Sequence, residues 1–110
     1  MSLSSPSSLL AFNPNVPTNN PNTQIIAVPF LLDSVAMINN DTAVLGLRFY
    51  FSPDGVTWTQ FYRQANITAN GNSAIQAFGG IYLPYGLQVS LTQAPTTTGM
   101  AVGVFGRTVN

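Results

Sequence analysis

The chain has 110 residues, zero net charge and only 5% charged side chains, against about 25% in ordinary soluble proteins. It contains no Lys, Glu, His or Cys, which removes disulfides, thiolate and imidazole metal ligands and most general bases. Three Arg cannot make the basic stripe of a nucleic-acid-binding protein, and no apolar run approaches the roughly 20 residues of a membrane helix. Because a surface with little charge favours association, the composition indicates a protein that is covered by partners.

Residues 1–23 differ from the rest of the chain, because they are rich in Ser, Asn and Pro. Proline fixes φ and biases the preceding residue toward extended geometry, so an extended N-terminal arm is predicted. Leu9, Leu10 and Phe12 interrupt the polar composition. Two interpretations stay open: a solvated tail, or an arm that lies on a neighbouring subunit through these three residues. We expect an arm at 1–23 and one domain at 24–110.

From residue 24 onward the pattern predicts strands. Residues 24–32 are rich in β-branched and large apolar side chains, and Pro29 within them indicates an edge strand or a bulge. Residues 34–38 extend this strand or form the next one. A turn is predicted at 39–41.

The clearest prediction is a hairpin between residues 44 and 64. Alternate residues of 44–51 are large and apolar, which places Leu45, Leu47, Phe49 and Phe51 on one face. Residues 52–55, Ser-Pro-Asp-Gly, suit a type I turn followed by a bulge, and 57–64 is the returning strand. This three-residue loop pairs Ser52 with Val56, Tyr50 with Trp58 and Arg48 with Gln60.

The remaining elements are short strands separated by turn residues. Strands are predicted at 73–78, 87–92 and 100–105, with a weaker strand end at 66–68. Breaks are predicted at 70–71, 79–80 and 95–99, and a bend at 84–86 follows residues 81–83. No segment shows helical periodicity. The rhythm predicts an all-β fold, an antiparallel β-sandwich of jelly-roll or Greek-key type, with a small barrel as the alternative.

The residue types argue against catalysis. Serines are plentiful, but no His, Lys or Glu is present to take a proton from them. The three aspartates, Asp33, Asp41 and Asp54, all stand beside turn residues, where a carboxylate caps backbone N–H groups. The run 39–41, Asn-Asn-Asp, lacks the alternating spacing of a calcium loop. We therefore predict no enzyme activity, no cofactor and no metal site.

One sheet face is predicted to be rich in aromatic rings. Arg48, Tyr50, Trp58 and Tyr62 fall on the face opposite the core residues of the hairpin. Three interpretations stay open: a face covered within the subunit, an interface between subunits, or a platform for glycans. Aromatic residues with Arg are typical of interface centres, so these four residues, together with Leu9, Leu10 and Phe12, are the predicted interface.

In composition and in the order of its segments, the whole chain resembles small bacteriophage virion β-sandwich proteins. The resemblance is carried by the Ser/Pro/Asn-rich arm, by a domain rich in Thr, Asn, Gln and Gly, and by the closing runs 83–91 and 99–106. It implies a structural virion protein on the capsid surface, a decoration or cement protein. Its partners would be the capsid protein and copies of itself, as a trimer, with no nucleic acid and no membrane.

Two alternatives to this function stay open. Within the same class, the chain could be a component of a phage tail, baseplate or fibre. In a different class, it could be a carbohydrate-binding module that uses Tyr50, Trp58 and Tyr62 as stacking platforms.

Overall fold

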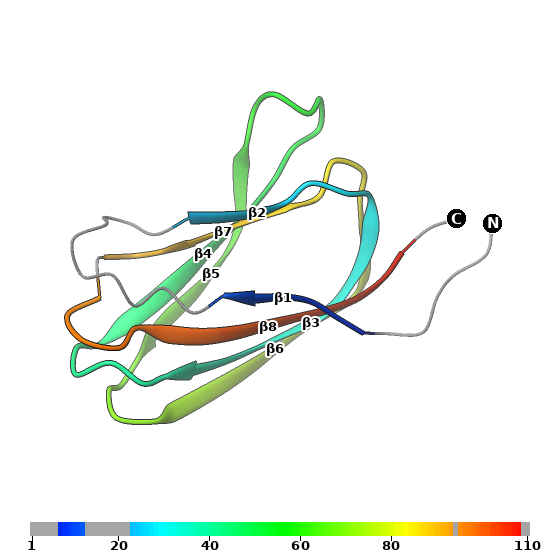
Figure 1. Ribbon diagram of the computed structural model, residues 1–110. Coiled ribbons are helices and arrows are strands. Elements are labelled where there is room, and N and C mark those ends of the chain that lie inside the picture. Colours follow the sequence, from blue (N-terminus) through cyan, green and yellow to red (C-terminus); the bar gives the residue numbers. More distant parts are fainter. Residues whose placement is uncertain (1–6, 13–22, 94, 109–110) are drawn as a thin grey trace.

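The computed structural model describes residues 7–12, 23–93 and 95–108, without the side chains of 7–12 and Gln24 (Figure 1). These residues form eight strands and no helix, so no helix long enough to cross a membrane occurs in this part of the chain. The strands are β1 (Ser7–Phe12), β2 (Thr23–Ile26), β3 (Phe30–Asn39), β4 (Leu45–Phe51), β5 (Thr59–Ile67), β6 (Asn72–Leu83), β7 (Leu87–Leu91) and β8 (Met100–Thr108).

The strands form two four-stranded sheets that face each other, which confirms the predicted all-β sandwich (Figure 1). The first sheet has the order β1-β8-β3-β6, and the second has the order β2-β7-β4-β5. The pairs are antiparallel and nested: β1 pairs with β8, β2 with β7, β3 with β6, and β4 with β5. The first half of the chain therefore pairs throughout with the second half.

The core lies between the two sheets and is built from alternate residues of the strands. In β4 the predicted alternation is confirmed, since Leu45, Leu47 and Phe49 are fully buried. In β3 a bulge at Asp33 changes the phase of the alternation, so that buried positions move from even to odd numbers. The fully buried large side chains are Phe30, Leu32, Val35, Met37, Leu45, Leu47, Phe49, Leu87, Val89, Leu91 and Met100.

Part of the predicted N-terminal arm is a strand of the sandwich. Residues 7–12 form β1, which pairs with β8 of the same chain, with Leu10 opposite Val104 and Phe12 opposite Val102. The two interpretations predicted from the sequence, a solvated tail and an arm on a neighbouring subunit, both lack this pairing of residues 7–12 with β8 of the same chain. Residues 1–6 and 13–22 of the predicted arm lie outside the described residues.

Two predicted element boundaries are corrected by the structure. Pro29 lies in the connection between β2 and β3 rather than within a strand, because its missing N–H cannot join a ladder. The predicted break at 79–80 is instead part of β6: Gly79 and Gly80 both adopt positive φ, and pairing with β3 resumes at Ile81. The two glycines bend the strand without ending it.

The loops at one end of the sandwich, which we call the basal loops (40–44, 68–71, 92–93 and 95–99), converge on Asn39 and Asp41. Asn39 is fully buried, and its amide donates to the carbonyls of Ala43 and Ile67 at 3.0 and 2.8 Å. The Asp41 carboxylate accepts six hydrogen bonds, two each from Thr96 and Thr97 and one each from the N–H groups of Gly99 and Ala43. This carboxylate joins loops that are far apart in the sequence.

Candidate interaction surface

The β4–β5 hairpin is longer and paired differently from the prediction. Tyr50 lies opposite Gln60 rather than Trp58, and Arg48 lies opposite Arg63 rather than Gln60. The last pair before the loop is Phe51 with Thr59, so the loop covers residues 52–58. The predicted three-residue turn and its register are therefore wrong.

The Asp54 carboxylate explains why the loop is long. Its Oδ1 accepts hydrogen bonds from the N–H groups of Val56 and Thr57, at 2.8 and 2.7 Å, and from the Ser52 hydroxyl. The Ser52 hydroxyl in turn accepts the N–H of Gly55 at 2.8 Å. The N–H groups of Thr57 and Val56 lower the pKa of the exposed Asp54 to about 2. Hydrogen bonds from the side chains of Asp54 and Ser52 therefore hold this loop, whereas the prediction assumed a short turn held by backbone hydrogen bonds.

Tyr62 lies on the core side of the sheet and not on the predicted aromatic face. The pairing shifts between Phe49 and Tyr50, which leaves Phe61 as an extra residue in β5 and brings Tyr62 opposite Phe49. The Tyr62 ring lies 5.7 Å from Phe49 and 5.3 Å from Phe78, between centroids. Its hydroxyl donates to Gln76 Oε1 at 2.7 Å. The bulge thus removes Tyr62 from the predicted surface.

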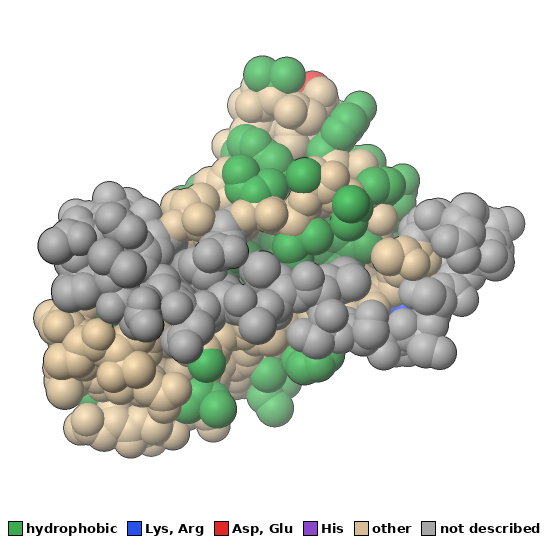
Figure 2. All heavy atoms as spheres, in the orientation of Figure 1, with side chains coloured by type: hydrophobic (Ala, Val, Ile, Leu, Met, Phe, Trp, Pro, Cys, Tyr) green, Lys and Arg blue, Asp and Glu red, His purple; other side chains and the backbone are tan. Residues whose placement is uncertain are grey.

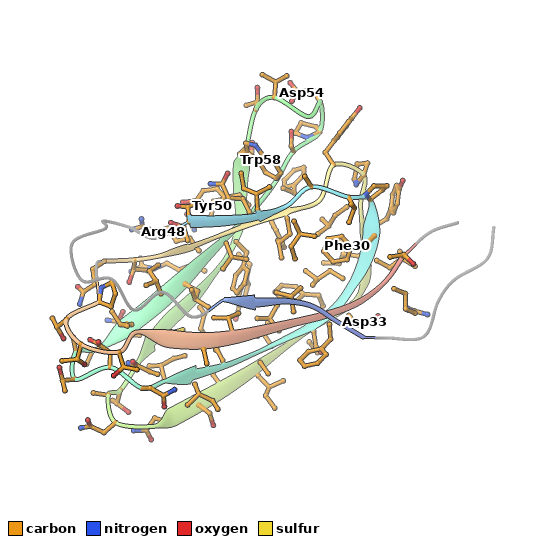
Figure 3. All side chains as sticks on the ribbon, viewed as in Figure 1. Phe30, Asp33, Arg48, Tyr50, Asp54 and Trp58 are labelled. Atoms are coloured by element: carbon orange, nitrogen blue, oxygen red, sulfur yellow. The ribbon has the colours of Figure 1, made fainter. Side chains whose placement is uncertain are left out.

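The other predicted interface residues lie in three places (Figure 3). Arg48 and Tyr50 are partly exposed on β4, and Trp58 is partly buried at the end of the hairpin loop. Arg48 and Arg63 are neighbours across β4 and β5. Within residues 7–12, 23–93 and 95–108 the one ion pair joins Arg107 to Asp33, so neither arginine of this pair has a carboxylate partner there. The side chains of Leu9, Leu10 and Phe12 lie outside the described part.

The loops at the other end of the sandwich carry a cluster of exposed apolar side chains. We call these loops, 27–29, 52–58 and 84–86, the apical loops. Val28, Val56 and Tyr85 are all exposed, and Val56 reaches 82%. The loop between β4 and β5 projects beyond the rest of the described chain (Figure 1).

The apical loops support one another. A Cβ on Gly55 would lie 3.0 Å from the ring of Tyr85, so this ring covers the hairpin loop. At Gly86, with φ of +93°, a Cβ would clash with the carbonyl oxygen of Ile26, so the turn packs directly on the end of β2. Only glycine fits this close approach. The three loops therefore form one built surface, which we call the apical surface.

Hydrophobic side chains gather over this part of the molecule, with a single acidic group among them (Figure 2). Asp54 is the one charged residue in the apical loops. Among the aromatic residues of the sequence Tyr85 is a candidate for stacking on sugars, but Val28 and Val56 were missed because their loops were treated only as turns. The available signal was an apolar residue next to Pro or Gly in each loop: Val28-Pro29, Gly55-Val56 and Pro84-Tyr85-Gly86.

The acidic side chains of the described residues serve the fold. Asp33 accepts Arg107 through both carboxylate oxygens at 3.0 and 3.2 Å, Asp41 joins the basal loops, and Asp54 closes the hairpin loop. No three acidic side chains gather as metal ligands in this part of the chain. Neither a protein-family model nor a curated protein matches this chain.

Proposed function

We propose that the chain is a structural virion protein, a capsid decoration protein that binds the outside of a protein shell and stabilises it. The observation that carries the proposal is the nested pairing of the eight strands, β1 with β8 through to β4 with β5. We infer from it a jelly-roll topology, in which a long hairpin is rolled into two sheets. Jelly rolls are typical of viral capsid and lectin domains.

The distribution of charge supports binding to a protein lattice. Asp33, Asp41 and Arg107 are engaged within the chain, and the apical surface carries only Asp54. Binding through such a surface gains little from Coulomb attraction, so it changes little with ionic strength. A particle that meets water of varying salt content needs attachments of this kind.

The proposed attachment is made by the apical surface. Exposed apolar side chains on a rigid support lose little conformational freedom on binding, so the burial of Val56, Val28 and Tyr85 contributes directly to affinity. A bound decoration protein adds buried area that must be exposed again before the shell opens. The protein acts as a mechanical brace, and no reaction is involved.

Fold alone does not specify function, so the competing assignments are part of the test. For a tail, baseplate or fibre component, the chain would occupy one pole of a particle instead of its whole shell. For a carbohydrate-binding module, the predicted platform keeps Tyr50 and Trp58 but loses Tyr62, whose ring packs against Phe49 and Phe78.

The proposal is tested by locating the chain in the organism that encodes it. Particles are separated on a density gradient and labelled with an antibody raised against the purified chain. We expect the chain to sediment with the particles and the label to surround the shell. Label at one pole assigns a tail component instead, and a chain that stays in the particle-free fractions overturns the virion assignment.

A further inference from the structure

We propose that β6 pairs along its free edge with β6 of a second copy of this chain, which joins two first sheets into one across a two-fold axis. β6 is the last strand in the order β1-β8-β3-β6, and within the described residues its pairing is with β3 alone. A strand with one free side presents unpaired N–H and C=O groups. This inference does not depend on the proposed function.

Between Asn72 and Ala77, ahead of the bend at Gly79 and Gly80, the free edge of β6 lacks the features that proteins use to prevent edge pairing. Residues 72–78 contain no charged side chain and no proline, and they pair with β3 without a shift between Asn72 and Ala77. The other edges differ. β1 has six residues and a shift of register against β8, β2 has only four residues, and β5 carries Arg63 and two shifts of register against β4. β6 is thus the long, regular edge of the sandwich.

The occupant is a second copy because the outward side chains of this edge are self-complementary. Ser73, Ile75 and Ala77 are exposed and follow one another as small, large and small. Antiparallel pairing centred on Ile75 places Ile75 opposite Ile75 of the second copy, and Ser73 opposite Ala77 of the second copy. No like charges meet in this register.

The position of Ile75 gives the second copy an apolar contact as well as backbone hydrogen bonds. Its side chain is 77% exposed, and its neighbours across the sheet are Ala36 and then Gly103. These small residues leave Ile75 uncovered on the side of β3. An isoleucine from the second copy would lie beside it, on a shared face that continues with Ile38 and Ala101.

One group on the edge has a local partner. The Gln76 side-chain amide donates to the carbonyl of Ala77 at 2.9 Å, on the exposed side of the strand. A backbone N–H of the second copy can replace this exposed hydrogen bond to the Ala77 carbonyl. The Tyr62 hydroxyl holds Gln76 Oε1 in either state.

The mass of the purified full chain in analytical ultracentrifugation tests the pairing. We expect a concentration-dependent dimer, in place of the trimer expected from the sequence. Ile75→Lys places two ammonium groups opposite each other, so the mass of the assembly should fall by half. Its thermal unfolding should match that of the wild type at concentrations where both chains are monomeric. Ile38→Lys is the matched control, because Ile38 is exposed on the same face but lies on β3, an interior strand. It should leave the dimer intact.

A cross-linking measurement fixes the register. The chain contains no cysteine, so Ile75→Cys introduces a single thiol. Directly paired strand residues have Cα atoms about 5 Å apart, within disulfide range. We expect oxidation to link Ile75→Cys chains into dimers and to leave Ile38→Cys chains unlinked. A chain that is monomeric at every concentration, a trimer, or a dimer that survives Ile75→Lys overturns the proposal.

Discussion

Asp41 and Thr96 lie 55 residues apart in the chain, yet the Asp41 carboxylate accepts both the N–H and the hydroxyl of Thr96, at 3.0 and 2.7 Å. Thr97 repeats the arrangement on the other carboxylate oxygen, at 2.6 and 2.9 Å. One side chain thereby connects the β3–β4 loop to the β7–β8 loop.

Asp41→Asn should destabilise the fold by about 2 to 4 kcal/mol, because an NH2 group would face N–H donors that a carboxylate oxygen now accepts. The measurement is the free energy of unfolding in urea at neutral pH. Asp54→Asn is the control, since Asp54 is exposed and serves only the hairpin loop. If Asp41→Asn loses no more free energy of unfolding than Asp54→Asn, Asp41 does not hold the basal loops together as described.

Stability should also fall in acid because of Asp41. Its burial by itself raises the pKa, but hydrogen bonds from Thr96, Thr97 and Gly99 outweigh burial and hold the pKa of Asp41 well below 3.8. The unfolded chain takes up a proton near pH 3.8 that the folded chain still excludes. The contribution of Asp41 is therefore complete above pH 3.8 and is lost as the pH falls further, by about 1.4 kcal/mol per pH unit.

The check is urea unfolding of the wild-type chain and Asp41→Asn between pH 7 and pH 2. The free-energy difference between them should be constant at neutral pH and should narrow below pH 3.8. Asp54, with a pKa of about 2, affects both proteins equally. A difference that stays constant down to pH 2 would show that the folded chain binds the proton as readily as the unfolded one.

Two glycines with similar φ separate backbone strain from close packing. Gly71→Ala adds a Cβ with nothing within 4 Å, at φ of +90°, so only the left-handed conformation opposes it. We expect a loss of about 1 kcal/mol, or about 4 °C in Tm. The Cβ of Gly86→Ala, at φ of +93°, also clashes with the carbonyl oxygen of Ile26, so this variant should lower Tm by at least twice as much. Equal shifts in thermal unfolding would contradict the packing of the apical loops.

The sequence predicted what short-range patterns can determine. The alternation of Leu45, Leu47 and Phe49 identified the core face of β4, because period-2 burial depends only on the strand itself. The register of β5 could not be read in this way. It depends on the Asp54 carboxylate and on the extra residue Phe61, and a shift of one residue moves each side chain to the other face. Tyr62 was misplaced for this reason.

Contacts between residues far apart in the chain could not be predicted from local sequence patterns either. Residues 7–12 look like part of an extended arm, and only their pairing with β8, nearly the whole chain away, makes them a strand. Asp41 was correctly placed in a turn, but its donors come from Thr96, Thr97 and Gly99. The apical surface was missed because three separate loops assemble it.

Tyr62 variants test the correction to the predicted aromatic face. Tyr62→Phe keeps the ring contacts with Phe49 and Phe78 and removes only the bond to Gln76, so a loss of about 1 kcal/mol is expected. Tyr62→Ala also removes the ring and should cost about 3 kcal/mol. Particle binding by Tyr62→Phe should equal that of the wild type. If Tyr62→Phe binds particles less well but is as stable as the wild type, Tyr62 belongs to the binding surface after all.

The apical surface is tested by Val56→Asp. Val56 is 82% exposed, so the free energy of unfolding should change by less than about 0.5 kcal/mol. A charge at the tip of the hairpin must lose its water on binding, so particle binding in a co-sedimentation titration should fall at least about tenfold. Val44→Asp, an exposed position in the basal loops, is the control and should bind normally. If both variants bind particles equally well, the apical loops are not the site of attachment.

Arg48 and Arg63 give the neutral chain a polarity that its net charge conceals. Arg48 and Arg63 are paired across β4 and β5, whereas the exposed carboxylate of Asp54 lies at the end of the hairpin (Figure 3). Charges of opposite sign are therefore separated along this hairpin, although the charges of the whole chain sum to zero. In dilute buffer a cation exchanger would attract the protein through the arginine pair, and an anion exchanger would attract it through Asp54. A charged surface would therefore orient the protein before contact.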